Sequence, residues 1–345
     1  MRVSQLPSIL PLVLTTLTGS LVLAQERCDA PSPGIYCNST EILAYHSDDC
    51  KPFHIFISRG SDEPYPGRLG NLTSEICAAI GGSEECGYED VEYPAKSTAW
   101  GQGVWCDSAG KGAKSGQAQM KAYSEKCPDS KLIVLGYSQG GSVAQDMLGG
   151  GGGSVFACEQ DMNPALDATS APGSNVVAAV TFGAVVRSRD QNFTVGRGVD
   201  YDGTSARSPE HLEGLNAYAD VLLDYCHYGD PICAVGSEPQ DVNEHLNYFM
   251  QHNPEVIKWV AGMAKASGDV SEKPSKPVIS ASSSSTSVPA RPQATPSGSA
   301  TPSPIATPTD DAVKSAQTSA TGAASSVTAT LGYMTALALT VAIFL

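Results

Sequence analysis

The stretch from residue 267 to 326 limits most strongly where this chain can fold. It contains no aromatic residue and no cysteine, and Ser, Thr, Pro and Ala dominate it. Such a composition buries too little apolar surface to offset the conformational entropy that folding removes. We therefore predict an extended, O-glycosylated stalk over residues 267–326. A packed domain has to lie before it, within residues 25–266, which is enough chain for one sizeable core.

The first residues have the pattern of a secretory signal peptide. Arg2 precedes a largely apolar run over residues 6–23, and Ala24 ends a small-residue pattern that suits signal peptidase. We predict a signal peptide over residues 1–24 and a secreted protein that starts near Gln25. A first transmembrane helix is the alternative, which the prolines and the glycine inside the apolar run disfavour.

The hydrophobic C-terminal tail, residues 327–345, resembles a signal for a glycosylphosphatidylinositol (GPI) anchor. Its apolar run is shorter than the roughly 20 residues that span a bilayer. Small residues and an uncharged spacer precede that run. We expect the tail to be replaced by lipid at Ser319 or Gly322, which would hold the protein on the outer leaflet of the membrane. A transmembrane tail is the alternative.

The cysteine content predicts disulfides. All ten cysteines fall between Cys28 and Cys233, and an even number in a secreted domain indicates up to five bridges. We expect no metal, because the spacing of the cysteines and histidines gives no paired zinc motif. Three sites begin Asn-x-Ser/Thr and predict N-glycosylation: Asn38, Asn71 and Asn192. The net charge of −15 argues against nucleic acid or anionic lipid as a partner.

Strand and helix signals alternate along the predicted domain. Apolar runs that indicate buried strands are FHIFISRG from residue 53, KLIVLGY from 131, VVAAVTFGAV near 177 and LNAYADVLLDYC from 215. Helical spacing appears over residues 72–80, 113–126, 139–148 and 245–265. This alternation predicts an α/β fold with a parallel sheet covered on both faces. Loops at the carboxyl ends of such strands build functional sites.

The segment GYSQGG from residue 136 follows one of these runs and precedes a helical pattern. A serine on a sharp strand-to-helix turn needs small residues two positions before and after it, and Gly136 and Gly140 meet that need. Ser138 is therefore a candidate nucleophile. The amide of Gln139, at the start of the helix, is a candidate oxyanion donor. A glycine-rich turn without a catalytic task is the alternative.

A serine nucleophile needs a histidine base, which in this architecture follows the carboxylate in the chain. Of the six histidines, three precede the candidate carboxylates. His227 lies inside a small cysteine loop, and His252 has the spacing of a surface or packing residue. His245, at the start of the last helix, is the best candidate.

Asp230 is the candidate carboxylate that orients the base. It stands at the end of the last apolar run, between Cys226 and Cys233, whose separation suits a tight local disulfide. Such a bridge would fix the loop and the carboxylate. A stapled turn with a solvated aspartate is the alternative, which becomes less favoured when Ser138 and His245 are considered together with it.

These residues resemble the cutinase and acetylxylan esterase family. The matching motifs are SRGSDEP from residue 58, GYSQGG from 136, GDPIC ending at Cys233 and HLNY from 245. They occur in the family's order and approximate spacing, and the resemblance covers residues 50–265. It implies a small, lidless α/β-hydrolase: a three-layer α/β/α sandwich around a five-stranded parallel sheet.

The resemblance also implies a role for each matching position. Ser138 would be the nucleophile, His245 the general base and acid, and Asp230 its orienter. The backbone N–H groups of Ser61 and Gln139 would form the oxyanion hole, helped by the Ser61 hydroxyl. Cys226 would pair with Cys233, and Cys50 with Cys127. The pairing of the other cysteines stays open: Cys28, Cys37, Cys77, Cys86, Cys106 and Cys158.

The implied activity is that of a monomeric serine esterase without a cofactor. The cysteine content is more similar to acetylxylan esterases, whereas RGSDEP is more similar to cutinases. The loop before His245 carries Pro239, Asp241 and Glu244, and is less apolar than a lipid polyester site would favour. We therefore favour short acyl esters of plant cell-wall polymers, with acetylxylan ahead of cutin. A non-enzymatic, wall-binding surface protein on the same fold is the alternative from another class, and a peptidase is possible on the triad alone.

Overall fold

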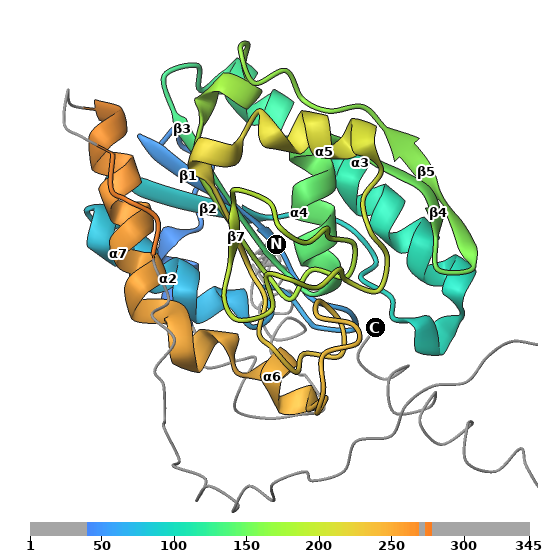
Figure 1. Ribbon diagram of the computed structural model, residues 1–345. Coiled ribbons are helices and arrows are strands. Elements are labelled where there is room, and N and C mark those ends of the chain that lie inside the picture. The colour runs from blue at the N-terminus through green and yellow to red at the C-terminus, as the bar shows by residue number, and fades with distance from the viewer. Residues whose placement is uncertain (1–39, 269–272, 278–345) are drawn as a thin grey trace, which may run out of the picture. The chain divides into compact units, whose positions relative to one another are not determined.

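A parallel sheet between two layers of helices forms the domain (Figure 1). The computed structural model describes residues 40–268 and 273–277. The strands lie in the order β2 (Cys86–Asp90), β1 (Phe53–Ser58), β3 (Lys131–Tyr137), β6 (Val176–Phe182), β8 (Leu222–Tyr225) and β7 (Thr194–Val195). All neighbouring pairs are parallel. The predicted three-layer α/β/α class is confirmed, but the sheet has six strands rather than five, because the two-residue strand β7 extends one edge.

Two helical layers cover the faces of the sheet. On one face α2 (Leu69–Ile80) packs against α7 (Tyr248–Gly268), and on the other α3 (Gln102–Lys126) packs against α4 (Gln139–Gly149). Helix α5 (Pro209–Asn216) lies against α4, and the short α6 (Val242–Leu246) precedes α7. An antiparallel hairpin of β4 (Gly151–Val155) and β5 (Cys158–Asn163) packs on α3. The remaining elements are 3-10 turns: η1 (Thr40–Tyr45), η2 (Thr98–Trp100), η3 (Gly173–Asn175) and η4 (Ala219–Val221).

Alternation along the central strands divides the core between the two faces. Phe56 packs with the α3 and α4 layer, while its neighbours Ile55 and Ile57 pack with α2 and α7. Strand β3 repeats the pattern, with Leu132 and Val134 on one face and Ile133 and Leu135 on the other. Successive side chains of a strand point to opposite faces, so a strand covered on both faces must be apolar throughout. This is why apolar residues predominate in these two strands, although β1 also contains the buried residues His54 and Ser58.

The structure differs from the predicted strand at residues 215–226. Only Leu222–Tyr225 is strand, and the residues before it form the end of α5 and the turn η4. Leu215 and Tyr218 are the buried apolar residues before the strand, and Leu222 is the first buried residue within it. Their spacing of three and four residues is helical rather than alternating. The apolar run therefore joins two elements.

Four disulfides tie the described elements together: Cys50–Cys127, Cys77–Cys86, Cys106–Cys158 and Cys226–Cys233. The first and last are the pairs that the family resemblance implies. The other two join α2 to β2 and α3 to β5. Cys28, Cys37, Asn38, Ser319 and Gly322 lie outside the described residues, as do the predicted signal peptide and C-terminal tail. Over residues 40–268 and 273–277, no helix combines the length and the apolar character needed to cross a membrane.

The end of the domain lies slightly beyond the predicted boundary at residue 266. Helix α7 continues to Gly268. Within residues 273–277, the Lys276 ammonium donates to the backbone carbonyls of Asn192 and Ala219, both at 2.7 Å. The first part of the predicted stalk therefore contacts the domain.

Candidate active site

Ser138 occupies a strained turn between β3 and α4. Its backbone has φ 56° and ψ −120°, a conformation that L-residues rarely adopt and that costs on the order of 1–3 kcal/mol. The Ser138 amide donates to the Phe182 carbonyl at 2.9 Å, which holds the turn against the neighbouring strand β6. A serine presented in this way projects from the end of the sheet, as in a nucleophile elbow.

The two glycines around the serine permit a very close approach of backbone segments. A Cβ atom at Gly136 would lie 2.4 Å from the Gly140 carbonyl oxygen, and one at Gly140 would lie 2.0 Å from the Ser58 carbonyl oxygen. Both contacts are shorter than real Cβ atoms allow. The start of α4 is therefore pressed against the end of β1, which places the loop that contains Ser61 beside the turn.

Three predicted residues from distant parts of the chain meet at this edge of the sheet. The His245 Nε2 atom lies 3.0 Å from Ser138 Oγ, and the His245 Nδ1 atom lies 2.8 Å from Asp230 Oδ2. Ser138 comes from the end of β3, Asp230 from the loop after β8 and His245 from α6. Both spacings suit a serine that gives its proton to an imidazole whose other nitrogen donates to a carboxylate.

Hydrogen bonds hold the Asp230 carboxylate at both oxygens. Oδ1 accepts from the amides of Ile232 at 2.7 Å and Cys233 at 3.3 Å, and Oδ2 accepts from the Tyr248 hydroxyl at 2.6 Å as well as from His245. Burial by itself raises the pKa of Asp230, but the charge of His245 and these hydrogen bonds outweigh it and hold the pKa below the ordinary value. Asp230 therefore stays ionised although it is fully buried.

Neighbouring residues also fix the backbone and ring of His245. Asp241 directly precedes α6, and its carboxylate caps the helix by accepting from the Asn243 amide at 2.9 Å. The Tyr137 hydroxyl donates to the His245 carbonyl at 3.0 Å. Gly183 leaves room for the ring, because a Cβ atom there would lie 2.7 Å from His245 Cε1.

The predicted oxyanion donors lie on two segments that are tied together. Gln139 begins α4, so its amide is one of the free N–H groups at a helix start. Its side chain donates to the Lys96 carbonyl at 2.9 Å. The Asp62 amide, next to Ser61, donates to the Ala95 carbonyl at 2.6 Å. The segment around residues 95 and 96 thus links the Ser61 loop to Gln139.

Two tyrosines that support the site were not predicted from the sequence. Tyr137 precedes Ser138 and holds the His245 backbone, while Tyr248 follows His245 by three residues and holds Asp230. The helical spacing of Tyr248 from His245 was an available signal for a shared location. Nothing in the sequence indicated which group either hydroxyl would bind.

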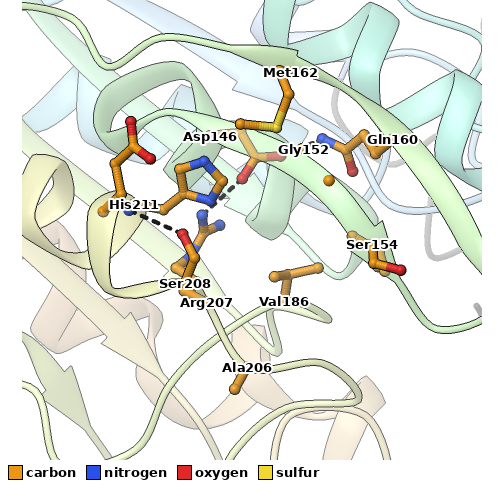
Figure 2. Close-up of a pocket in the computed structure, with 13 residues that line it drawn as sticks. Asp146, Gly152, Ser154, Gln160, Met162, Val186, Ala206, Arg207, Ser208 and His211 are labelled. Carbon is orange, nitrogen blue, oxygen red and sulfur yellow. Dashed lines mark hydrogen bonds and ion pairs between the residues drawn. The ribbon is translucent and has the colours of Figure 1, made fainter.

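A pocket near the other end of α4 is separate from this site (Figure 2). Its volume is about 370 Å³, and none of its lining residues belongs to the group of Ser138, Asp230 and His245. Arg207 and Gln160 donate to the Asp146 carboxylate there at 2.8 and 2.7 Å. Its buried charges thus satisfy one another. His211, buried at the same pocket, serves below as a control position.

Comparisons with known proteins agree with the geometry. The cutinase family model matches residues 49–263. An acetylxylan esterase of Hypocrea jecorina is 25% identical over 223 residues, which cover 64% of this chain and 69% of that protein. Cutinase 11 of Verticillium dahliae is 26% identical over 193 residues, 54% of this chain and 61% of that protein.

Solved structures show the same fold. An acetylxylan esterase structure at 0.90 Å resolution has a TM-score of 0.52 at 22% identity, and the match covers 63% of this chain and all of that one. The catalytic core domain of acetyl xylan esterase from Trichoderma reesei has a TM-score of 0.50 at 22% identity, with 61% and 98% covered. Since the family model also spans more than half of the sequence, this chain belongs to the cutinase family of carboxylic-ester hydrolases.

Proposed function

We propose that this protein is a secreted serine esterase in which Ser138, His245 and Asp230 cleave short acyl esters on plant cell-wall polymers, with acetylated xylan preferred. The observation that carries the proposal is the contact of His245 with both Ser138 Oγ and Asp230 Oδ2, at 3.0 and 2.8 Å. Family membership makes a purely wall-binding role the weaker alternative.

The first half of the reaction acylates the serine. His245 Nε2 takes the Ser138 proton as Oγ attacks the ester carbonyl, and the ionised Asp230 stabilises the resulting imidazolium through Nδ1–H. The amides of Gln139 and Ser61 then donate to the oxyanion, a contribution for which one donor is typically worth about 10² to 10³ in turnover. His245 gives its proton to the leaving alcohol as the tetrahedral intermediate collapses.

The second half uses the same groups in reverse. Water enters where the alcohol left, His245 takes a proton from it, and the hydroxide formed attacks the acyl carbon. Ser138 recovers its proton from His245 as the acid departs. Neither half needs a metal or a cofactor.

Two observations bear on the substrate. Two of the similar proteins are named acetylxylan esterases, from Hypocrea jecorina and Talaromyces purpureogenus, and the loop before His245 exposes Glu238, Gln240 and Asp241. Both support a polar polymer. Val235 and Val242, which are 46% and 37% exposed, flank the same loop and support a longer acyl chain, so cutin is the second candidate.

The proposed location is the cell surface, with one domain per polypeptide acting as a monomer. Four disulfides support an oxidising compartment. Asn71 and Asn192 are exposed, as N-glycosylation requires. The tail sequence supports a lipid anchor that replaces residues after Ser319 or Gly322.

The test compares acid release from acetylated xylan, tributyrin and cutin by the secreted protein. We expect acetate from xylan to dominate, and Ser138→Ala to abolish release from all three while leaving the circular dichroism spectrum unchanged. A fluorophosphonate probe should label the wild type and not the variant. Activity retained by Ser138→Ala would refute the assignment of the nucleophile, and dominant cutin hydrolysis would reverse the order of substrates.

A further inference from the structure

Behind the proposed triad, Tyr248 connects Asp230 to a histidine outside the triad. The Tyr248 hydroxyl donates to Asp230 Oδ2 at 2.6 Å and accepts from the His227 amide at 3.0 Å. The rings of Tyr248 and His227 are stacked, with centroids 4.1 Å apart. Burial, followed by the Asp230 charge, raises the pKa of Tyr248 well above its ordinary value, so the hydroxyl keeps the proton that it donates.

The His227 ring also reaches the backbone next to the proposed base. Its Nδ1 atom lies 2.8 Å from the carbonyl oxygen of Glu244, the residue before His245. A carbonyl can only accept a hydrogen bond, so Nδ1 carries the proton. His227 therefore touches the supports of both Asp230 and His245.

The second nitrogen of His227 faces another histidine. Its Nε2 atom lies 2.7 Å from His252 Nε2. Because the proton of neutral His227 is on Nδ1, His227 Nε2 accepts and His252 donates. His252 Nδ1 in turn lies 2.6 Å from Glu255 Oε1. His252 is then either an imidazolium beside a carboxylate or a neutral ring beside a carboxylic acid, and in both cases one proton is shared within the pair.

This arrangement fits only one total number of protons. A second proton on His227 would set two N–H groups against each other across 2.7 Å. Loss of the proton shared by His252 and Glu255 would leave the contact between His252 Nδ1 and Glu255 Oε1 without its hydrogen. Burial, chiefly, lowers the pKa of His227 to about 4, so its ring is neutral at pH 7.

The charged and titratable groups around the two rings come from several elements. A cavity of about 170 Å³ borders both rings, and Arg197, Tyr228 and Glu244 line it as well. The Glu244 carboxylate lies 3.2 Å from His227 Nδ1, and the Tyr225 ring centroid lies 4.7 Å from that of His252. Asp230, His245, Tyr248 and Glu255 complete the set.

We propose that His227 is a positioning residue, which holds Asp230 through Tyr248 and His245 through the Glu244 carbonyl. The hydrogen bond from His252, which shares a proton with Glu255, keeps the His227 ring in place. The proposal rests on the proposed roles of Ser138, Asp230 and His245. His227 itself touches no reacting atom.

The first test separates the two contacts of His227 by substitution in the full secreted chain. His227→Phe keeps the stacked ring and loses both hydrogen bonds of the imidazole. We expect its kcat on p-nitrophenyl butyrate at pH 7 to fall on the order of 10-fold, with KM nearly unchanged. This loss is smaller than the roughly 100-fold that a misplacement of the catalytic groups by 1 Å costs. His227→Asn places an amide N–H where Nδ1 stood, and should recover most of the loss.

His211→Phe is the matched control, because His211 is 8% exposed, close to the 6% of His227, and lies at the separate pocket of Figure 2. It should keep the wild-type kcat. Wild-type kcat in His227→Phe, or an equal loss in His227→Asn and His227→Phe, would overturn the proposal. If His227→Phe is fully active while Ser138→Ala is inactive, the positioning proposal fails and the proposed function stands; if both are active, the proposed function itself fails.

A pH profile tests the protonation argument. In His252→Phe, His227 Nε2 loses the donor that stabilises its neutral form, so the pKa of His227 should rise, although burial still holds it below its ordinary value. A charged His227 opposes the charge that His245 gains in the transition state, so the acidic limb of kcat/KM should move to higher pH. In the His227→Asn background the same substitution should not move the limb. A limb that stays in place in His252→Phe, or that moves equally in both backgrounds, would contradict the proposal.

Imidazole nitrogen NMR of the wild type gives a readout that needs no variant to fold. His227 should appear at pH 7 as the neutral tautomer with its proton on Nδ1. The opposite tautomer, or an imidazolium at His227, would overturn the proposal.

Discussion

At the scale of single residues, Ser138 combines its proposed catalytic role with an unfavourable backbone conformation. Its φ of 56° is unfavourable for a side chain, and the cost on the order of 1–3 kcal/mol must be offset by the packing around it. The hydrogen bond from its amide to Phe182 and the tight fit of Gly140 against Ser58 supply part of that packing. The strain should therefore be visible when the side chain is removed.

Ser138→Gly tests this strain. Glycine adopts positive φ without the penalty of a Cβ atom, so Ser138→Gly should be more stable than Ser138→Ala by about 1 kcal/mol. Both variants should be inactive. Urea unfolding of the two proteins measures the difference. Equal stability, or a less stable glycine variant, would show that the turn is not strained by its side chain.

The lowered pKa of His54 makes the stability of the folded protein depend on pH. Its ring is stacked on Tyr123, with centroids 3.7 Å apart, and burial first, then the charges of His46 and Lys126, lower its pKa to about 3. Glu89 lies 3.8 Å away, yet burial raises the pKa of Glu89 to about 7. Burial thus disfavours the charged form of both groups, and their contact is not a strong ion pair.

The direction in which stability changes with pH follows from the protons that the folded and unfolded states bind. Between about pH 6.5 and about pH 3 the unfolded chain binds a proton at His54 that the folded protein lacks, so the contribution of His54 to stability falls as the pH drops through this window, by up to about 1.4 kcal/mol per pH unit. The raised pKa of Glu89 acts in the opposite direction between about pH 7 and pH 4.5. Replacing His54 with Phe should therefore change the slope of stability against pH by one proton, toward greater stability at low pH. Urea midpoints at pH 7, 5 and 4 measure this. The same slope in wild type and variant would mean that His54 is protonated when folded.

At the scale of elements, the sequence predicts best those strands and helices whose own burial fixes their pattern of apolar residues. The strands at Phe53–Ser58 and Lys131–Tyr137 are covered on both faces, so burial makes most of their residues apolar. Strand Cys86–Asp90 was not predicted, because it lies at the sheet edge and carries Glu89 and Asp90. The hairpin of β4 and β5 was also not predicted, since its glycines and polar residues have little alternation to reveal it.

The approach of α4 to β1 predicts the effect of Gly140→Ala. Its Cβ atom would lie 2.0 and 2.3 Å from the backbone oxygens of Ser58 and Arg59, and neither can move without displacing the strand end. We expect destabilisation of at least the 1–3 kcal/mol typical of overpacking, and a loss of kcat on the order of 100-fold from a displaced Gln139 amide.

Gly103→Ala is the control in another helix. A Cβ atom at Gly103 would meet nothing within 4 Å, and Ala favours the helix by up to about 1 kcal/mol. Thermal unfolding and kcat of both variants measure the contrast. A Gly140→Ala variant as stable and active as Gly103→Ala would show that the contact between α4 and β1 can relax.

At the scale of the whole molecule, the candidate site was easier to predict than its supports. Ser138, Asp230 and His245 carry reactive groups in an order that the strand pattern places at one edge. A buried hydrogen-bond network is an example of a support that the sequence does not predict. In it, Gln145 donates to Asp224 at 2.8 Å and accepts from Arg207 at 2.9 Å. It joins two buried ion pairs, Arg187 with Asp224 and Arg207 with Asp146. Each partner comes from a distant segment, so no local pattern marks the contact.

Two disulfides with different places in the molecule should separate stability from activity. Cys106–Cys158 joins α3 to the hairpin of β4 and β5 across 52 residues, whereas Cys226–Cys233 closes 7 residues around Asp230. Loop entropy predicts a loss of about 4 kcal/mol for the first and about 2 kcal/mol for the second when each pair is replaced by alanine.

The effects on catalysis should have the reverse order. The shorter bridge holds the Cys233 amide, which donates to Asp230 Oδ1 at 3.3 Å, so its removal should lower kcat on p-nitrophenyl butyrate by about 10-fold or more. The longer bridge touches no residue of the site, and kcat of the folded variant should stay within about twofold of wild type. Urea unfolding and kcat are measured on the same preparations below the midpoint of each variant. A larger loss of kcat without Cys106–Cys158 than without Cys226–Cys233 would mean that the Asp230 loop is held by its hydrogen bonds alone.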